Sequence, residues 1–581
     1  MKKDTAAHLR RIATANRREL IKAGLSRRDL IKMGLVTSAG YLVAKRGLSA
    51  RASDGQPHSP PTRPFIEPLP IVPVKQPVGM LDPAPTIAPN TAAGEGRTRS
   101  HQALARFPPR KLYEVHQRAA LVSMSPDLPL QTIWGFDGMT PGPTYVARYG
   151  EPILVRNFNE LPVNNDGFGL NEVSTHQHNG HTPSESDGFP CDFFRAGQFY
   201  DQHYPNALAG FASTHPPNGD PNEALGTLWY HDHRVDFTSQ NVYKGLAGFY
   251  LLFDNLDTGD ETTGLRLPSG ECDVPLIVAD KVFDEDGRLF FDLFNLDGIL
   301  GDRFLVNGKI QPFFEVHPRR YRFRILDGGP SRFYEFFLTD ANAPNTTIPF
   351  WQISNGGNLL PKPLQVTSVR LGVAERADII IDFSQLAGRS IFLENRLEQV
   401  DGRGPTGRIL APGQGNSVLR FDVVLPPVPD QSADPAAIAQ LRALPPLAPA
   451  DVTRTFRFER SNGQWTINDR FFDCNDVRFR IRQNTGEHWV LQNNSGGWQH
   501  PIHVHFEEFQ IISRNGRPPS AVERSRKDVV RLQFNEEIVI ASRFRDFVGR
   551  YPMHCHNTVH EDHAMMLRWD IDDAGDGKAQ P

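Results

Sequence analysis

Three strand-like segments recur at nearly equal intervals along the chain. They are GEPILVRNFNEL (150–161), RRYRFRILDGG (319–329) and GEHWVLQNNSGG (486–497). Their matching positions Asn157, Asp327 and Asn493 lie 170 and 166 residues apart. Apolar closing segments follow each of them: GFYLLFD (248–254), ADIIIDF (377–383) and MMLRWDI (565–571). Short alternating strands repeated at this interval predict three similar β-sandwich domains.

The stretches between these repeats complete the expected organisation. Residues 53–105 and 426–451 are rich in Pro and predict an extended arm and a linker. We therefore expect an all-β protein with domains at 106–260, 261–425 and 452–581. Within the second domain, RRYRFRI (319–325) alternates polar and apolar residues, which predicts a half-buried strand.

The first 52 residues resemble a twin-arginine export signal. SRRDLIK (26–32) precedes the apolar run MGLVTSAGYLVA (33–44), a basic pair and an Ala-x-Ala sequence at 50–52. The apolar run is too short to span a bilayer, which takes about 20 residues. We predict passage through the twin-arginine export machinery to the periplasm or the exterior, with no membrane span.

The charge of the chain disfavours one class of partner. The formal net charge is −4, and residues 1–52 hold 13 Lys and Arg against 3 Asp and Glu, so the remainder carries about −14. Nucleic-acid-binding domains present a basic surface. We therefore expect no nucleic-acid partner.

Ten of the twenty histidines lie in four short clusters. The clusters are THQHNG (His176, His178), WYHDH (His231, His233), HPIHVH (His500, His503, His505) and HCHNTVH (His554, His556, His560). Between His233 and His488 the chain has only His317. Metal binding is therefore expected in the first and third domains, not in the second.

Spacing indicates how these side chains are arranged. His-x-His on a strand places both imidazoles on one face, about 7 Å apart. Three such pairs could surround a compact site for several metal ions. In HCH, the two histidines point one way and Cys555 points the other, so one strand would contact two different metal sites.

The cysteine fits a copper site of its own. A thiolate, two imidazoles and a weak thioether form a blue-copper centre. Cys555, His560 and Met565 lie close together in the sequence, and His500 would supply the second imidazole. Zinc also binds Cys and His, but it explains neither the Met spacing nor so many histidines.

These four motifs, in this order, resemble those of the multicopper oxidases, over about residues 105–572. The similarity is greatest to bacterial three-domain laccases of the spore-coat and bilirubin-oxidase-like group. It is carried by LWYHDHRVDFTSQNVYKGLAGFYLL, FLVNGKIQPFFEV and GRYPMHCHNTVHEDHAMM. It implies three cupredoxin-like Greek-key β-sandwich domains. Asn179 and Phe506 depart from the common pattern, and neither removes a ligand.

The resemblance also implies four copper ions per chain. The type 1 copper would be bound by His500, Cys555, His560 and Met565. The type 2 copper would be bound by His176 and His503. The type 3 pair would be bound by His178, His231, His233, His505, His554 and His556. Asp187 and Glu561 match acidic positions thought to relay protons; the alternatives are an Asp-Gly turn for Asp187 and a solvated loop carboxylate for Glu561.

The implied activity is an oxidase that reduces dioxygen to water with electrons from a small-molecule substrate near His560. Phenols and aromatic amines are the expected substrates. A metallo-oxidase acting on Mn(II), Cu(I) or Fe(II) and a non-enzymatic cupredoxin scaffold are the alternatives. The eight methionines form no Met-rich segment, which disfavours Cu(I). Mn(II) would need carboxylates near the type 1 copper, for which Glu507, Glu508 and Asp546 are candidates.

Three further points stay open in the sequence. Cys191, Cys272 and Cys474 allow at most one internal disulfide, and the sequence does not select the pair. Met565 as an axial ligand predicts a moderate type 1 potential. We expect a monomer.

Overall fold

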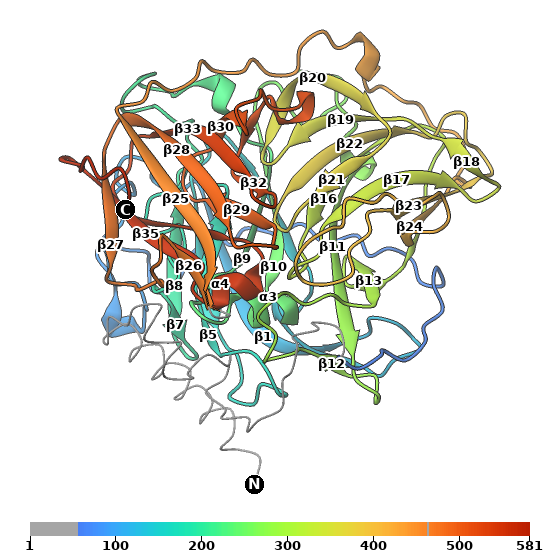
Figure 1. Ribbon diagram of the computed structural model, residues 1–581, viewed down its shortest axis with the longest axis horizontal. Coiled ribbons are helices and arrows are strands. Elements are labelled where there is room, and N and C mark those ends of the chain that lie inside the picture. The colour runs from blue at the N-terminus through green and yellow to red at the C-terminus, as the bar shows by residue number, and fades with distance from the viewer. Residues whose placement is uncertain (1–55, 462–463) are drawn as a thin grey trace.

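The computed structural model describes residues 56–461 and 464–581. The predicted export signal at residues 1–52 lies outside this part. The expected all-β class is confirmed, since the described chain is dominated by strands that form three pairs of sheets. Figure 1 shows domain 2 on the right and domain 3 on the left, with helices α3 (Thr238–Lys244) and α4 (Thr558–Asp562) side by side at the centre.

Domain 1 packs the sheet β2-β1-β4-β8 against the sheet β3-β10-β9-β6, and β5 pairs with β7. Its strands are β1 (Lys111–Val122), β2 (Gln131–Phe136), β3 (Gly142–Arg148), β4 (Ile153–Asn159), β5 (Glu172–Val173), β6 (Thr175–His178), β7 (Phe194–Arg195), β8 (Phe199–Tyr204), β9 (Thr227–Asp232) and β10 (Ala247–Phe253). The 3-10 turn η2 (Pro221–Glu223) precedes β9. Alternate side chains of both sheets, among them Trp134, Tyr145 and Tyr230, fill the core between them.

Domain 2 packs the sheet β14-β13-β11-β16-β22-β19-β20 against the sheet β15-β24-β23-β17-β18. Its elements are η3 (Gly270–Cys272), β11 (Asp273–Phe283), β12 (Leu289–Phe290), β13 (Arg303–Val306), β14 (Lys309–Ile310), β15 (Phe313–Glu315), β16 (Arg320–Asp327), β17 (Tyr334–Asp340), β18 (Ala343–Thr347), β19 (Phe350–Asn355), β20 (Asn358–Val366), β21 (Val369–Leu371), β22 (Arg376–Asp382), β23 (Ser390–Asn395) and β24 (Asn416–Asp422). β12 joins the first sheet beside β11, and β21 joins the second beside β17.

Domain 3 packs the sheet β26-β25-β28-β33-β30-β31 against the sheet β27-β35-β34-β29-β32. Its strands are β25 (Val452–Ser461), β26 (Gln464–Ile467), β27 (Val477–Arg482), β28 (Thr485–Asn494), β29 (His500–Val504), β30 (Phe509–Arg514), β31 (Arg526–Lys527), β32 (Val529–Leu532), β33 (Glu537–Phe544), β34 (Gly549–Cys555) and β35 (Met566–Asp572). The 3-10 turn η5 (Ala521–Glu523) precedes β31. Cys555 and Met565 belong to the core between the two sheets.

The repeated segments occupy the same position in each domain. β4, β16 and β28 each pair parallel with the first long strand of their domain, β1, β11 or β25. On the other side they pair antiparallel with β8, β22 and β33. The sequence repeat therefore marks one recurring strand of a common sandwich.

The closing segments are not all equivalent, and that part of the prediction is wrong. β10 and β35 pair parallel with β3 and β27, but the strand that does so in domain 2 is β24, beside β15. ADIIIDF forms β22, which lies in the opposite sheet. An apolar run indicates that a strand is buried on both faces. More than one strand of a sandwich can be buried in this way, so the run does not identify which strand it is.

The prediction for RRYRFRI is also wrong, because β16 is buried on both faces. Arg322 and Arg324 are 1% and 0% exposed. Arg322 pairs with Asp378 and Asp257 at 2.5 and 2.7 Å, and Arg324 pairs with Asp273 at 2.7 Å. Arg324 also donates to Thr227 Oγ1 of domain 1 at 2.8 Å. Buried guanidinium groups are retained here because carboxylates neutralise them.

The arm and the linker follow the surfaces of the domains. Residues 56–105 contain the turn η1 (Thr91–Ala93) and form isolated bridges to β15, β3, β1 and β8. The linker contains η4 (Pro435–Ala437). Within 56–461 and 464–581 no helix has the length and apolar character needed to cross a membrane.

A disulfide and an apolar cluster join the domains. Cys191 of domain 1 is bonded to Cys474 of domain 3, with their Cα atoms 6.1 Å apart. Cys272 and Cys555 are free and buried. One apolar cluster has members from all three domains, among them Trp229, Ile277 and Val529. The three sandwiches therefore share buried surface around the place where the histidine-bearing strands meet.

Candidate metal centre

Strand register brings the predicted histidines face to face. In domain 1, β6 pairs antiparallel with β9, and His176 lies opposite His231. In domain 3, β29 pairs antiparallel with β34, and His503 lies opposite His554. His233 and His505 follow directly after β9 and β29. The predicted two-residue period thus sets the position of each imidazole.

Eight imidazoles meet between domains 1 and 3, and we call them the histidine cluster. The His176 and His505 rings lie 3.9 Å apart, and the His178 and His503 rings 3.8 Å apart. All eight side chains are at most 1% exposed. The members are His176, His178, His231, His233, His503, His505, His554 and His556.

Outward nitrogens of four cluster members are held by oxygen atoms of the protein. Nδ1–H of His176, His231 and His503 donates to the carbonyls of Asp187, Asp232 and Asp528 at 2.5, 2.8 and 2.9 Å. In His178 the outward nitrogen is instead Nε2, which lies 2.6 Å from Asp528 Oδ2. Such contacts fix the ring orientation and leave the other nitrogen free to act as a ligand.

The inward nitrogens have no such support from the protein. Among the described residues, Nε2 of His176, His231 and His503 and Nδ1 of His178 are buried without a hydrogen-bond partner. Nε2 atoms of His233, His505 and His554 lie 3.1–3.2 Å from one another. Burial lowers the pKa of His233 and His505, and that of His231 to about 3, so these rings are neutral and each carries only one N–H to donate.

This donor set fits metal ions. Converging buried lone pairs are costly without a partner, and neutral imidazole is a good ligand for copper or zinc. Three-residue groups within ligand distance of one another include His176, His178 and His231, and also His233, His505 and His554. Sites for several ions can therefore be formed without moving the backbone.

A second group, the cysteine group, lies within domain 3. Sγ of Cys555 is 3.4 Å from Nδ1 of His500 and 3.6 Å from Nδ1 of His560. The two Nδ1 atoms are 3.2 Å apart. Met565 is buried, and its backbone N–H donates to the carbonyl of His560 at 3.1 Å. These four residues, His500, Cys555, His560 and Met565, are the predicted type 1 ligands.

The cysteine group also needs a cation. Burial raises the pKa of the Cys555 thiol well above its usual range, so the thiol alone would stay protonated. A bound metal ion deprotonates a coordinating thiol. Nε2 of His500 and Nε2 of His560 are held from outside by Ser495 Oγ at 2.9 Å and the Asp297 carbonyl at 3.0 Å.

One strand end connects the two groups. Cys555 closes β34 between His554 and His556. His554 faces His233 and His505, and His556 faces His178 and His231, with ring centres about 5 Å apart. Cys555 faces His500 and His560 instead. The predicted opposite orientation of the thiol and the imidazoles is what the structure has.

The two predicted acids are enclosed beside the histidine cluster. Asp187 Oδ2 is 2.8 Å from Nδ1 of His505, and burial raises the pKa of Asp187 well above its usual range. Glu561 lies on α4 and places its two oxygens 3.1 Å from Nδ1 of His233 and of His554. Glu561 is 1% exposed, so it is not a solvated loop carboxylate.

Sequence reasoning missed two residues that support the ligands. Asp528 contacts His178 and His503 and is held by Arg376 of domain 2 at 2.8 Å. Asp297, also of domain 2, contacts His560. Neither lies near a histidine in the sequence, and no local pattern distinguishes them from other aspartates.

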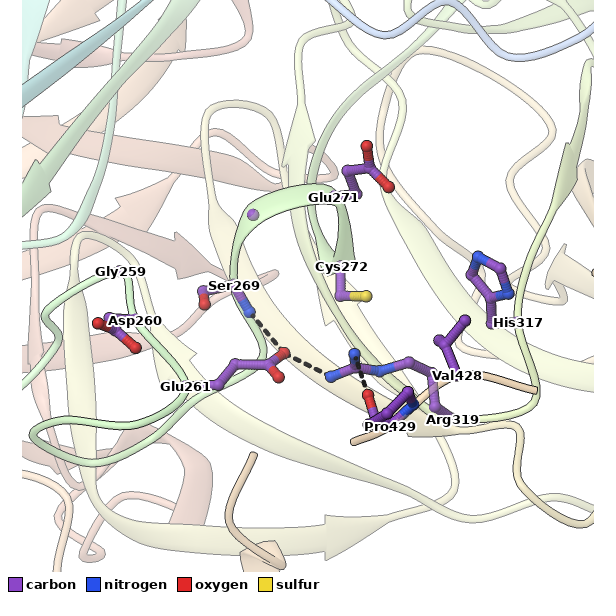
Figure 2. Close-up of a pocket in the computed structure, with 11 residues that line it drawn as sticks. Gly259, Asp260, Glu261, Ser269, Glu271, Cys272, His317, Arg319, Val428 and Pro429 are labelled. Atoms are coloured by element: carbon purple, nitrogen blue, oxygen red, sulfur yellow. Dashed lines mark hydrogen bonds and ion pairs between the residues drawn. The ribbon is translucent and has the colours of Figure 1, made fainter. Parts of the chain in front are cut away.

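A surface cavity of about 580 Å³ lies elsewhere, on domain 2. Figure 2 shows Arg319 inside it, bonded to Glu261 and to the Pro429 carbonyl, with the Cys272 thiol nearby. None of the predicted ligands or acids lines this cavity. It therefore does not belong to the metal-binding region.

Comparison with known proteins agrees with this geometry. Family models described as multicopper oxidase match residues 120–256 and 445–575, the segments that carry the two halves of the histidine cluster. A bilirubin oxidase of Albifimbria verrucaria is 36% identical, covering 78% of this chain and 75% of its own. A laccase of Bacillus stratosphericus is 32% identical, covering 80% of this chain and 95% of its own.

A solved structure has the same fold. The laccase of Pediococcus acidilactici superposes with a TM-score of 0.69 at 23% identity, covering 89% of this chain and 96% of that one. The family models and the identity to two curated relatives over most of the chain agree with the two ligand groups. The chain therefore belongs to the multicopper oxidase family, whose members are oxidoreductases that use oxygen as the electron acceptor.

Proposed function

We propose that the protein is a laccase-like oxidase that takes single electrons from phenols or aromatic amines and reduces dioxygen to water. The observation that carries this proposal is the arrangement of two ligand groups on one strand end, with Cys555 facing one group and its two neighbours facing the other. Such an arrangement suits a protein that receives electrons at one site and uses them at another.

Twelve residues would hold four copper ions. His500, Cys555, His560 and Met565 would hold the type 1 ion; His176 and His503 the type 2 ion; and His178, His231, His233, His505, His554 and His556 the type 3 pair. When bound, copper would supply one-electron acceptance at the first site and four-electron reduction of dioxygen at the other three. The family membership and the convergence of these side chains support this assignment.

Asp187 and Glu561 would donate and accept protons at the histidine cluster. Burial raises the pKa of Asp187 well above its usual range, which favours its protonated form. Burial would also raise the pKa of Glu561, but His554 and His233 beside it lower that pKa well below its usual range. Two acids whose pKa values are pushed apart can divide proton donation and acceptance between them. Both also fix the orientation of ligand imidazoles.

The three carboxylates considered for manganese give less support to manganese oxidation. Glu507 pairs with Arg545 at 2.5 Å, Glu508 with Arg526 at 3.1 Å, and Asp546 with His181 at 2.9 Å. Glu507 and Glu508 are thus paired with guanidinium groups, and Asp546 contacts an imidazole. The names of the bilirubin oxidase and laccase relatives favour an organic donor.

Oxygen uptake by the copper-loaded, blue protein supplied with 2,6-dimethoxyphenol tests the proposal. We expect rapid uptake without accumulation of hydrogen peroxide, since four electrons reach dioxygen together. Uptake with Mn(II) or Fe(II) but not with the phenol would contradict the proposed substrate class. A loaded protein that is not blue would contradict the role of Cys555.

A further inference from the structure

The histidine cluster is enclosed on all sides, so a metal ion cannot reach it in the closed structure. All eight imidazoles are at most 1% exposed. Residues 179–191, which we call the cover loop, lead from His178 to the disulfide at Cys191 and contact the cluster through Asp187. Every residue from 182 to 190 is buried. An ion must therefore enter while some part of the enclosure is open.

Two of the contacts that close the enclosure are strong. Where domain 2 meets the cluster, Arg376 pairs with Asp528 at 2.8 Å, and the two side chains are 0% and 2% exposed. At the far end of the cover loop, Cys191 is bonded to Cys474 of domain 3. Separating a buried ion pair leaves an uncompensated charge, which costs far more than exchanging a hydrogen bond for one to water. Opening is therefore expected at neither place.

The middle of the cover loop is held by the last part of the arm. Arg99 donates to the hydroxyl and the carbonyl of Ser184 at 2.8 and 2.9 Å. Gln102 donates from its backbone N–H and its Nε2 to the two carboxylate oxygens of Glu185, both at 2.8 Å. The Gln102 side chain also exchanges two hydrogen bonds of 3.0 Å with the backbone of Val548 in domain 3. The arm thus ties the cover loop to domain 3.

These tying residues lie at the surface, and we call residues 99–102 the clasp. Gln102 is exposed, the side chain of Arg99 is 30% exposed, and Val548 is 37% exposed. Water can replace hydrogen bonds at such positions, so the segments that they hold open at a small cost in free energy. The clasp is therefore the part of the enclosure expected to open first.

Two imidazoles outside the cluster lie beside Glu185, which the clasp holds. The ring centres of His101 and His203 are 5.9 Å apart, and Nδ1 of His101 is 3.8 Å from Glu185 Oε1. His101 is 4% exposed and His203 is 0% exposed. Among the described residues, both ring nitrogens of His101 and Nδ1 of His203 are buried without a hydrogen-bond partner. Buried imidazole nitrogens without partners are costly, and a copper ion is a suitable partner for them.

The cover loop connects this histidine pair to the cluster. Burial lowers the pKa of His203 to about 4, so its ring is neutral and can act as a ligand. The backbone N–H of His203 donates to Ser186 Oγ at 2.9 Å. The next residue, Asp187, contacts Nδ1 of His505 at 2.8 Å and Nδ1 of His176 at 2.5 Å. The pair therefore lies on the cover loop directly beside the residue that touches the cluster.

We propose that copper ions enter the histidine cluster beneath the clasp, and that His101 and His203 bind each ion briefly before it passes the cover loop. The clasp sets how often the route opens, and the histidine pair sets how well an ion is captured while it is open. The proposal rests on the copper sites of the proposed function, and it does not depend on the electron donor.

Copper uptake by the metal-free protein tests the clasp. Cu(II) would be added, samples would be desalted at intervals, and the electron paramagnetic resonance signal of the type 2 copper would report filling of the cluster. Gln102→Ala removes the three side-chain hydrogen bonds to Glu185 and Val548. We expect its cluster to fill about tenfold faster, because the loss of such hydrogen bonds favours the open form. Gln76→Ala is the matched control, since the side chain of this arm residue bonds to the Val74 carbonyl.

Removing an imidazole of the pair should have the opposite effect. His101→Leu should slow filling of the cluster severalfold, because an entering ion loses a ligand. His116→Leu, at a histidine of domain 1 that contacts Glu160, is the control and should fill at the wild-type rate. The blue colour should develop at the wild-type rate in all of these variants, because the cysteine group does not lie beneath the clasp. Wild-type filling rates in both Gln102→Ala and His101→Leu, or a change in the same direction in both, would overturn the proposal.

Hydrogen exchange measures the opening without copper. In the metal-free protein, Gln102→Ala should speed exchange of the backbone amides of residues 179–190 and leave those of β34 unchanged. Unchanged exchange in the cover loop would overturn the proposed opening. A wild-type cluster that takes up no copper would instead contradict the assignment of the metal sites, and exchange would still decide whether the clasp controls the cover loop.

Discussion

The cysteine group and the histidine cluster are built in opposite ways. All four members of the cysteine group come from domain 3, and three of them lie between residues 555 and 565. The histidine cluster takes four members from domain 1 and four from domain 3. The first group therefore needs only one folded sandwich, and the second needs two sandwiches docked in register.

The supporting contacts differ in the same way. Around the cysteine group, the outward nitrogens contact neutral oxygens, the Ser495 hydroxyl and the Asp297 carbonyl. Around the histidine cluster, three carboxylates, Asp187, Asp528 and Glu561, contact imidazoles. Neutral support suits a site that only passes electrons, and ionisable support suits one that also consumes protons.

Removing the thiolate should cause the largest expected effect, because the cysteine group should lose its blue copper site while the histidine cluster keeps its copper. Cys555→Ser replaces the soft ligand with a hydroxyl that binds copper weakly. We expect loss of the blue colour and a fall in phenol-dependent oxygen uptake of more than about a hundredfold, beyond the loss typical of outer contacts. The histidine cluster should keep its copper, as measured by metal analysis and electron paramagnetic resonance.

The other free cysteine provides the control for this change. Cys272 is buried in domain 2, away from both groups, and Cys272→Ser should stay blue and active. A Cys555→Ser protein that remained blue would show that Cys555 is not the type 1 ligand.

The sequence predicts local geometry better than long-range partners. The faces of His554, Cys555 and His556 follow from the two-residue period of a strand, so they were predictable. Asp528 and Asp297 come from distant segments, and only the docked domains bring them to the ligands. The same limit explains β16, whose polar alternation suggested solvent because the partner carboxylates lie far away in the sequence.

Neutralising Glu561 should affect the histidine cluster alone. Glu561→Gln removes the charge that faces Nδ1 of both His233 and His554. We expect cluster copper affinity and oxygen uptake to fall about 10- to 100-fold, as for other contacts that orient metal ligands. The blue colour should persist. Glu508→Gln, at an enclosed glutamate that pairs with Arg526, is the control; an equal loss there would indicate a general effect of buried charge.

Opening the Cys191–Cys474 disulfide should loosen the interface before it affects domain 3. The bridge closes a loop with a sequence separation of 283 residues, and such bridges contribute about 2–4 kcal/mol. In the double variant Cys191→Ala/Cys474→Ala, the electron paramagnetic resonance signal of the type 2 copper should disappear at a lower guanidinium concentration than the blue colour does. Cys272→Ala should leave the two transitions as in the wild type. Coincident loss of both signals in the double variant would mean that the interface does not depend on the bridge.

The smallest effect is expected at the neutral support of the cysteine group. The Ser495 hydroxyl donates to Asn493 Oδ1 at 2.7 Å, so it can accept from Nε2–H of His500. Ser495→Ala leaves that buried N–H without a partner, which costs about 1–3 kcal/mol of unfolding free energy. Oxygen uptake should fall less than in Glu561→Gln, because one neutral contact is lost and not a charge shared by two ligands. Denaturant titration followed by the blue colour measures the first quantity, and oxygen uptake measures the second. If Ser495→Ala lowered uptake as far as Glu561→Gln does, neutral and ionisable supports would be equivalent, and the contrast between the two groups would lie only in how the domains assemble them.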